Sequence, residues 1–120
     1  MIVIFFGPPG AGKGTQANLF SRKFQIPHLS TGEMLRKKLL DTDSLSRKLK
    51  KLIDTGNLVP DNILNEIISN RIVNTDCNKG FILDGYPRTL IQNKFLTNFL
   101  KDNNIKISLI FDLQLNENII

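Results

Sequence analysis

The sequence Gly7-Pro8-Pro9-Gly10-Ala11-Gly12-Lys13-Gly14-Thr15 directly follows six apolar residues, 1–6. A continuous apolar run of this length predicts a strand that is buried on both faces, as in a parallel sheet. Behind the loop, apolar residues recur at helical spacing and predict a helix over 15–24, at Ala17, Phe20 and Phe24. A strand, a glycine-rich loop and a helix in this order are typical of a phosphate-binding loop.

The glycines of this loop let the backbone curl with its N–H groups pointing inward, which forms an anion-binding nest at a helix N-terminus. Lys13 would then reach the β and γ phosphates of a nucleoside triphosphate. The general motif has Ser or Thr directly after the lysine, but here Gly14 stands there and the hydroxyl follows at Thr15. This weakens the assignment of a metal ligand, not that of a phosphate cradle. An ordinary glycine turn is the alternative, and the agreement of spacing, lysine and flanking elements disfavours it.

Length and composition indicate one domain of a soluble globular protein. The 120 residues suffice for a single core, and 41% of them are hydrophobic and 22% charged. No apolar segment approaches the roughly 18 residues that a membrane helix needs. Because the predicted strand begins at Met1, we expect no signal or transit peptide. Cys77, the single cysteine, can form no internal disulfide, which favours a reducing compartment, with the cytoplasm as the default.

The net charge of +5 and the pI near 9.6 raise the question of a nucleic-acid partner. The basic residues are scattered, no aromatic ladder interleaves them, and the chain has one Tyr and no Trp, so we expect no nucleic-acid partner. The pairs and runs at Lys37-Lys38 and 48–51 are interpreted as solvated helix faces. A basic surface would also steer anionic nucleotides toward a site.

Residues 25–60 predict a short strand followed by two helices. The strand is expected at 25–29, and Ser30 with Glu33 forms a capping box that opens a helix over 30–40 with Met34, Leu35 and Leu39 inside. A second helix, 44–54, carries an apolar stripe and ends at Gly56-Asn57; the stripe is Leu45, Leu49, Leu52 and Ile53. Two consecutive helices between strands make 30–59 look like an insertion in an alternating α/β order.

Gly32 and Arg36 lie four residues apart on the first of these helices, so the arginine covers a residue without a side chain. This arrangement leaves space for a ligand beside a guanidinium. On this segment alone, however, a surface arginine near an ordinary helix start is the better-supported interpretation.

A second chemistry-bearing stretch is 80–88. Asp61 is expected to cap a helix over 62–74 whose apolar face packs on the core, and a turn leads into a buried strand at 81–83. Asp84 follows at the carboxyl end of that strand, the edge where ligands bind in open parallel sheets. Apolar residues that run into an aspartate resemble the strand whose carboxylate holds magnesium directly or through water. Gly85 permits a close backbone approach, and Pro87 fixes the turn that aims Arg88.

The remaining residues predict one more helix and strand. The helix over 89–101 is expected to face inward with Ile91, Phe95 and Phe99, and Gln92 lies four residues after Arg88, so both can face one pocket. A fourth strand is expected at 107–113 and the start of a helix at 116–120. Because the chain ends on two apolar residues without a cap, we expect a fragment or a gene interrupted early.

Four motifs in this order resemble the adenylate kinase family, and the resemblance covers essentially the whole chain. They are 7–17, 29–36, 56–61 and 80–89. The order Lys-Gly-Thr at 13–15 is that family's own version of the loop. The resemblance implies an α/β P-loop nucleotide-kinase fold, a parallel sheet of four strands flanked by helices, with 1–120 as a single core and 30–59 as a mobile AMP-binding subdomain.

The implied reaction is reversible transfer between MgATP and AMP to give two ADP. The ATP phosphates would be held by Gly10, Ala11, Gly12, Lys13, Gly14 and Thr15, with Lys13 following the transferring group. The residues implied for AMP are Thr31 and Gln92 for adenine, Arg36 and Arg88 for the phosphate, Asn57, Leu58 and Val59 for base and ribose, and also Gly32 and Gly85. Asp84 would orient water on Mg2+, with Thr15 as a second metal contact, and Lys13, Arg88 and Asp84 are the expected catalytic residues.

One departure from the family concerns the lid. In the family, a lid with arginines follows the fourth strand, and a fifth strand and a final helix then complete the core; this sequence stops before them. Without a lid, water is not excluded, and each missing arginine would cost a few kcal/mol. The fourth strand would be an unpaired edge.

Three other functions stay open. They are a pyrimidine (UMP or CMP) monophosphate kinase, which Thr31 and Gln92 disfavour, a nucleotide-binding module without turnover and, more distantly, a nucleic-acid binder. We expect a monomer without a membrane partner, and His28, outside the motifs, is interpreted as structural.

Overall fold

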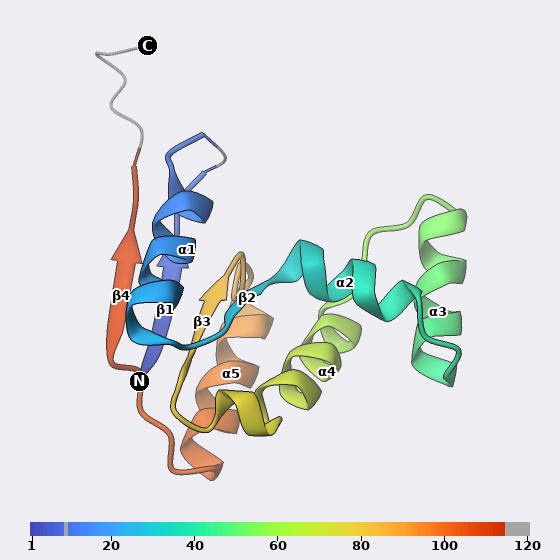
Figure 1. The fold of residues 1–120 in the computed structure, drawn as a ribbon. Helices are drawn as coiled ribbons and strands as arrows, with labels where there is room; N and C mark the ends of the chain where they lie inside the picture. Colours follow the sequence, from blue (N-terminus) through green and yellow to red (C-terminus); the bar gives the residue numbers. More distant parts are fainter. Residues whose placement is uncertain (9, 115–120) are drawn as a thin grey trace.

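The computed structural model describes residues 1–8 and 10–114, and its strands and helices alternate largely as predicted (Figure 1). In chain order the elements are β1 (Ile2–Phe6), α1 (Lys13–Phe24), β2 (His28–Ser30), α2 (Thr31–Leu39), α3 (Ser44–Asp54), α4 (Asp61–Ile72), the 3-10 turn η1 (Thr75–Cys77), β3 (Phe81–Asp84), α5 (Leu90–Asp102) and β4 (Leu109–Asp112). The predicted helix start at 116–120 lies outside the described residues.

The four strands form one parallel sheet in the order β2-β3-β1-β4, which confirms the predicted α/β class. Asp84, the last residue of β3, lies opposite Phe5 of β1 on one side and Ser30 of β2 on the other. Because all strands run the same way, their carboxyl ends meet at one edge of the sheet. That edge brings together the glycine-rich loop after β1, the start of α2 after β2, and Asp84.

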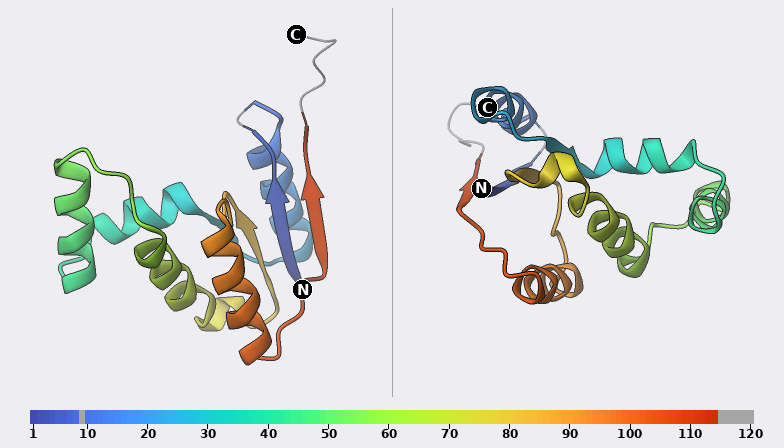
Figure 2. Two further views of the ribbon diagram at one scale, coloured as in Figure 1. Left: turned by 180° about the vertical axis from the view of Figure 1, so that it is seen from behind. Right: turned by 60° about the horizontal axis from the view of Figure 1, so that its bottom comes forward.

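Helices cover both faces of the sheet, and each face has its own apolar core. Along β1 the side chains alternate, with Ile2 and Ile4 in the larger core beneath α4 and α5, and Val3 and Phe5 in the smaller core beneath α1. The end-on view in Figure 2 shows α1 on one side of the sheet and α5 with α4 on the other. This two-sided burial explains why the strand is continuously apolar.

Helices α2 and α3 extend beyond the β2 edge of the sheet, so most of α3 lies away from the core (Figure 1). Leu49 is fully buried, whereas Ile53, expected on the same stripe, is 43% exposed. In α1, which begins at Lys13 rather than at Thr15, Ala17 is buried but the predicted inward Phe24 is 44% exposed. Both errors concern the last turn of a helix, which reaches past the surface that it covers.

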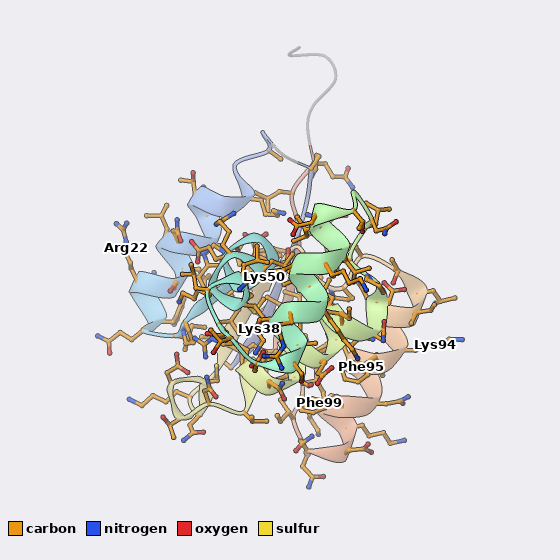
Figure 3. All side chains as sticks on the ribbon, turned by 90° about the vertical axis from the view of Figure 1, so that its right-hand side faces the viewer. Arg22, Lys38, Lys50, Lys94, Phe95 and Phe99 are labelled. Atoms are coloured by element: carbon orange, nitrogen blue, oxygen red, sulfur yellow. The ribbon has the colours of Figure 1, made fainter. Side chains whose placement is uncertain are left out.

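The inward face of α5 is one position off the prediction. The buried residues are Gln92, Leu96 and Leu100, whereas Ile91 is 63% exposed. Phe95 and Phe99, seen at the side of α5 in Figure 3, are half-buried and stack on each other with ring centroids 6.0 Å apart. The prediction was wrong because it placed only apolar residues inside, and here a hydrogen-bonded glutamine occupies that face.

Basic side chains are spread over several helices. The labelled residues in Figure 3 come from α1, α2, α3 and α5: Arg22, Lys38, Lys50 and Lys94. Over residues 1–8 and 10–114, the structure contains no helix long and apolar enough to span a membrane.

β4 forms one edge of the sheet and pairs only with β1 among the described strands. All four of its residues, 109–112, are exposed to solvent, and three of them are apolar: Leu109, Ile110 and Phe111. The strand is shorter than the predicted 107–113, and among the described strands it stands at an edge of the sheet.

Lys38 links α2 to α3 and is not the solvated side chain that the sequence predicted. Its ammonium lies 2.6 Å from Asp43 Oδ2 and 3.4 Å from Asp41. Asp43 is also the N-cap of α3 and accepts a 2.8 Å hydrogen bond from Ser46 N. The hydrogen bonds from Lys38 and Ser46 lower the pKa of Asp43 from its usual 3.8 to about 2.

We therefore expect acid to loosen the α2–α3 junction. A carboxyl whose pKa is lower in the folded state contributes stability above pH 3.8, and that contribution is lost as the pH falls toward 2. Urea unfolding at pH 5 and at pH 2.5 should show a smaller acid-induced loss for Asp43→Asn than for the parent, since Asn still caps a helix. Asp41→Asn is the matched control. An unchanged acid response of Asp43→Asn would contradict this assignment.

Candidate nucleotide-binding site

The loop between β1 and α1 has the backbone that an anion nest requires. Gly10 and Gly12 have φ values of +87° and +83°, and Gly12 is the N-cap of α1. A Cβ at either position would meet no other atom within 4 Å, so these glycines are required by backbone conformation rather than by crowding. The first turn of α1 carries no acidic residue, so no carboxylate of the helix would compete with an anion for its free N–H groups and its dipole.

Asp84 is held between two basic side chains at the carboxyl end of β3. Lys13 Nζ lies 2.8 Å from Oδ1, and His28 Nε2 lies 2.8 Å from Oδ2. Burial by itself raises the pKa of Asp84, but the His28 hydrogen bond and the Lys13 ammonium together outweigh it and hold the pKa below the usual range. The carboxylate is therefore ionised at neutral pH.

His28, which lies outside the motifs and was interpreted as structural, contacts one of the predicted site residues. Its ring bonds directly to Asp84, and its side chain is only 14% exposed. The predicted second strand, 25–29, contains His28, but nothing in the sequence places that strand beside the one that ends at Asp84. The pairing of β2 with β3, which the sequence does not state, is what makes the contact possible.

Gly85 brings the start of α2 next to Arg88. Its φ is +86°, and a Cβ there would lie 2.7 Å from Thr31 Oγ1 and 3.3 Å from an Arg88 Nη. Further along this turn, the peptide bond between Tyr86 and Pro87 is cis. The predicted close backbone approach at Gly85 is thus observed, and the space that a side chain would fill is shared by Thr31 and Arg88.

Gly85→Ala is expected to destabilise the fold by about 2–3 kcal/mol, since the left-handed backbone costs about 1–2 kcal/mol and the contact with Thr31 adds crowding. Gly56→Ala is the matched control. Gly56 has a φ of +75°, but a Cβ there would meet nothing within 4 Å. Thermal unfolding of both variants separates the cost of the left-handed backbone from the cost of crowding against Thr31. An equal loss of stability in both variants would show that the crowding contributes nothing.

Lys13 and Arg88 line one cavity of about 420 Å³ at the carboxyl edge of the sheet. The other residues that line it are Phe5, Phe6, Gly7, Gly85 and Pro87. The structure thus brings together two cationic side chains that are 75 positions apart in the sequence, one from the glycine-rich loop and one from the turn after β3. Such a cavity can hold phosphate groups between two cations.

Arg36 folds back over Gly32 as predicted, and one of its Nη atoms would lie 3.2 Å from a Cβ at that position. Thr31, at the start of α2, lies next to Gly85, so the first turn of α2 borders the cavity side of the sheet. Residues 57–59 do not line that cavity. Leu58 is 92% exposed, and Val59 packs partly against the core.

Gln92 is buried, and both ends of its amide are engaged within the protein. Its Oε1 accepts a 2.7 Å hydrogen bond from Arg88 N, and its Nε2 donates one of 2.8 Å to Asp61 Oδ1. Asp61 also accepts a hydrogen bond from Thr89 Oγ1 at 3.1 Å and is the first residue of α4 rather than its N-cap. The expected cap was wrong because this carboxylate is used to hold Gln92 and the start of α5.

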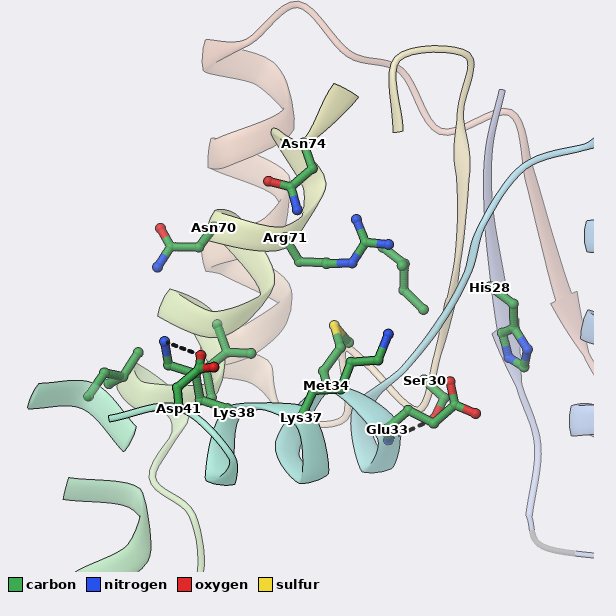
Figure 4. Close-up of a pocket in the computed structure, with 13 residues that line it drawn as sticks. His28, Ser30, Glu33, Met34, Lys37, Lys38, Asp41, Asn70, Arg71 and Asn74 are labelled. Carbon is green, nitrogen blue, oxygen red and sulfur yellow. Dashed lines mark hydrogen bonds and ion pairs between the residues drawn. The ribbon is translucent and has the colours of Figure 1, made fainter. Parts of the chain in front are cut away.

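A second cavity of about 250 Å³ lies between α2 and α4, on another side of α2 (Figure 4). Lys37, Arg71 and Asn74 contribute to its wall together with Met34. Arg71 makes two 2.7 Å hydrogen bonds to Asp76, so its charge is already paired. Residues of the motif at 29–36 also line this cavity, but the cations predicted to contact phosphate, Lys13, Arg36 and Arg88, do not.

At the carboxyl edge of the sheet, Asp84 offers its carboxylate to a magnesium ion. Within residues 1–8 and 10–114, no three His, Cys, Asp or Glu side chains are grouped to hold a metal by themselves. Asp84 Oδ1, however, is buried and accepts no hydrogen bond of ordinary geometry from the part of the chain that the structure describes. Mg2+ usually takes one or two carboxylates and completes its shell with substrate phosphates and water, so a carboxylate oxygen beside a phosphate cradle, held here only by the Lys13 ion pair, fits it.

The parallel sheet and the residues at its carboxyl edge define the class of protein. A parallel α/β sheet whose first strand leads through a glycine-rich loop and Lys13 into a helix, with an aspartate at the end of the adjacent strand, is a P-loop nucleotide-binding protein. The adenylate kinase family matches residues 5–120. The chain therefore belongs to the adenylate kinase family.

Two bacterial relatives illustrate the match. An adenylate kinase of Bartonella tribocorum is 48% identical over 117 residues, which is 98% of this chain and 61% of that protein. One of Rhizobium meliloti is 47% identical over 117 residues, with the same two shares. The chain thus spans about three fifths of the length of the relatives that it matches.

Proposed function

We propose that this chain is the nucleotide-binding part of an adenylate kinase that transfers a phosphoryl group reversibly between MgATP and AMP, giving two ADP. The observation that carries the proposal is the cavity shared by Lys13 and Arg88. Lys13 stands at the N-terminus of α1, where the ATP phosphates would bind, and Arg88 follows β3, where the AMP phosphate would bind. The cavity thus offers one cation to each reactant.

Phosphoryl transfer suits a site of this kind because it needs little covalent help from the protein. Two anions must be aligned and their charge neutralised. The backbone N–H groups over 10–15 would bind the ATP phosphates, and Lys13 would move with the transferring group. Arg36 and Arg88 suit the AMP phosphate, since a planar guanidinium makes two parallel hydrogen bonds.

The remaining assignments to AMP extend this proposal to its base and ribose. Thr31 and Gly32, in the first turn of α2, would border the adenine, and Asn57 to Val59 would line base and ribose from the loop after α3. Gln92 would read the adenine edge, which requires its amide to exchange a protein partner for the base, because both of its ends are engaged in this structure.

Asp84 is the residue that we assign to magnesium, through Oδ1, whose close partner in this structure is the Lys13 ammonium at 2.8 Å. When bound, Mg2+ would supply charge neutralisation at the β and γ phosphates. Asp84 would orient water on the ion, and Thr15 would offer a hydroxyl beside it. A monomer in the cytoplasm remains our expectation for the protein.

A coupled assay of ADP formation with AMP, UMP and CMP, together with equilibrium binding of ATP and AMP, tests the proposal. Turnover with a preference for AMP supports it, whereas a preference for UMP or CMP would identify a pyrimidine monophosphate kinase instead. Binding of both adenine nucleotides without ADP formation would support a nucleotide-binding module. Absence of ATP binding would contradict the assignment of the loop.

A further inference from the structure

The imidazole of His28 is fixed at both of its nitrogens. Nε2 lies 2.8 Å from Asp84 Oδ2, and Nδ1 lies 2.7 Å from Asn18 Oδ1. Asn18 comes from α1, His28 from β2 and Asp84 from β3, so three elements that enclose the carboxyl edge of the sheet meet in this one chain of contacts.

These contacts make the two oxygens of Asp84 unequal. Oδ2 is occupied by the ring of His28, whereas Oδ1 has only the ion pair with Lys13 at 2.8 Å. A carboxylate with one oxygen tied cannot turn both oxygens toward the same cation. Its other oxygen therefore keeps facing the glycine-rich loop.

The proton on Nε2 is determined by its partner. An ionised carboxylate only accepts hydrogen bonds, so the nitrogen that faces it must be a donor. The Asn18 side chain offers a carbonyl oxygen or an amide N–H to Nδ1, and can therefore hold the ring with or without a proton there. In both cases the ring stays in place and Nε2 donates to Asp84.

We propose that His28, held by Asn18, is a positioning residue that keeps Asp84 Oδ1 free to take up magnesium-bound water when Lys13 moves from Asp84 to the ATP phosphates. This inference rests on the proposed function, because it requires ATP at the loop. Partners of this kind, which orient a ligand without touching the metal, typically raise metal affinity about 10- to 100-fold. The same effect should appear here as a coupling between Mg2+ and ATP.

The coupling is measured as the Kd of ATP in EDTA divided by the Kd of ATP with saturating Mg2+, by titration calorimetry. His28→Leu removes the donor at nearly the same size, and we expect the ratio to fall about tenfold. His28→Gln keeps an N–H that can reach Oδ2, and its ratio should stay within about threefold of the parent. A general loss of structure would not be restored by glutamine.

Asn18→Leu gives a second, independent variant, because it leaves His28 in place but removes the support on its other nitrogen. We expect a decrease of about threefold in the ratio, and none for the matched control Asn70→Leu on α4. A parental ratio in both His28→Leu and Asn18→Leu would overturn the proposal. If His28→Leu fails to fold, Asn18→Leu against Asn70→Leu decides.

A second measurement separates this inference from the proposed function. His28 is the single histidine of the chain, so its ring signals in long-range 1H–15N NMR spectra need no assignment. In the ligand-free protein we expect a fixed proton on Nε2, with signals that move in Asp84→Asn and in Asn18→Leu. A ring that samples both tautomers would overturn the positioning role, whereas a fixed ring in a protein that binds no ATP would overturn the proposed function instead.

Discussion

Replacement of Lys13 by methionine is expected to weaken ATP binding by about a hundredfold, the equivalent of about 3 kcal/mol, and to abolish turnover in any active form that contains this chain. Methionine keeps the length and apolar stem of the side chain but removes the charge-assisted hydrogen bonds to phosphate. Lys13 is paired with Asp84 in the ligand-free structure, so ATP must draw the ammonium away from that carboxylate. The loss is therefore smaller than the full strength of the phosphate contact.

The Lys13→Met variant is tested by measuring its affinities for ATP and for AMP separately. ATP affinity should fall while AMP affinity stays within about threefold, because the AMP phosphate is assigned to the arginines. Lys94→Met is the matched control, since Lys94 is an exposed lysine on α5 (Figure 3). Equal losses for ATP and AMP would indicate that Lys13 supports the fold rather than the phosphate, and retained turnover would refute the loop assignment.

The sheet edge could be predicted from the sequence because its parts are local. The run 1–6, the glycines and Lys13 are contiguous, and a buried strand followed by Asp84 is a short pattern. Once both strands are taken as parallel, their carboxyl ends must meet. The sequence therefore places Lys13 and Asp84 at the same edge of the sheet, and the structure shows that they form a 2.8 Å ion pair.

The parts that the sequence did not predict depend on which strands and helices pair. His28 reaches Asp84 because β2 lies beside β3, and the strand order β2-β3-β1-β4 is not written in any one segment. Gln92 turns into the core because Asp61, 31 positions earlier, accepts its amide N–H. A periodicity rule that places only apolar residues inside does not find these polar partners.

These two polar contacts also show how the site is built into the core. Asp84 and Gln92 are 7% and 5% exposed, and each is hydrogen-bonded to another side chain, His28 and Asp61 respectively. A buried polar group without a partner would cost about 1–3 kcal/mol, so the partners His28 and Asp61 stabilise the fold as well. Residues such as His28 and Asp61, which support a site through hydrogen bonds, are recognised from their contacts in the structure and not from sequence motifs.

Arg88→Ala is expected to weaken AMP binding by about 2 kcal/mol, roughly thirtyfold, with ATP binding within about threefold of the parent. The side chain lies at the cavity and is exposed, so its removal leaves no buried group without a partner. The hydrogen bond from Arg88 N to Gln92 is made by the backbone, and alanine retains it. The variant therefore tests the guanidinium and little else.

Two further variants sharpen this test. Arg88→Lys keeps the charge but loses the planar pair of donors, so its AMP affinity should fall between those of the parent and Arg88→Ala. Arg22→Ala, which removes an exposed arginine from the last turn of α1, should bind AMP like the parent. An unchanged dependence on AMP concentration in Arg88→Ala would refute its role. Equal weakening of ATP and AMP would assign Arg88 to the shared cavity rather than to one nucleotide, because only a residue that contacts one phosphate can separate the two affinities.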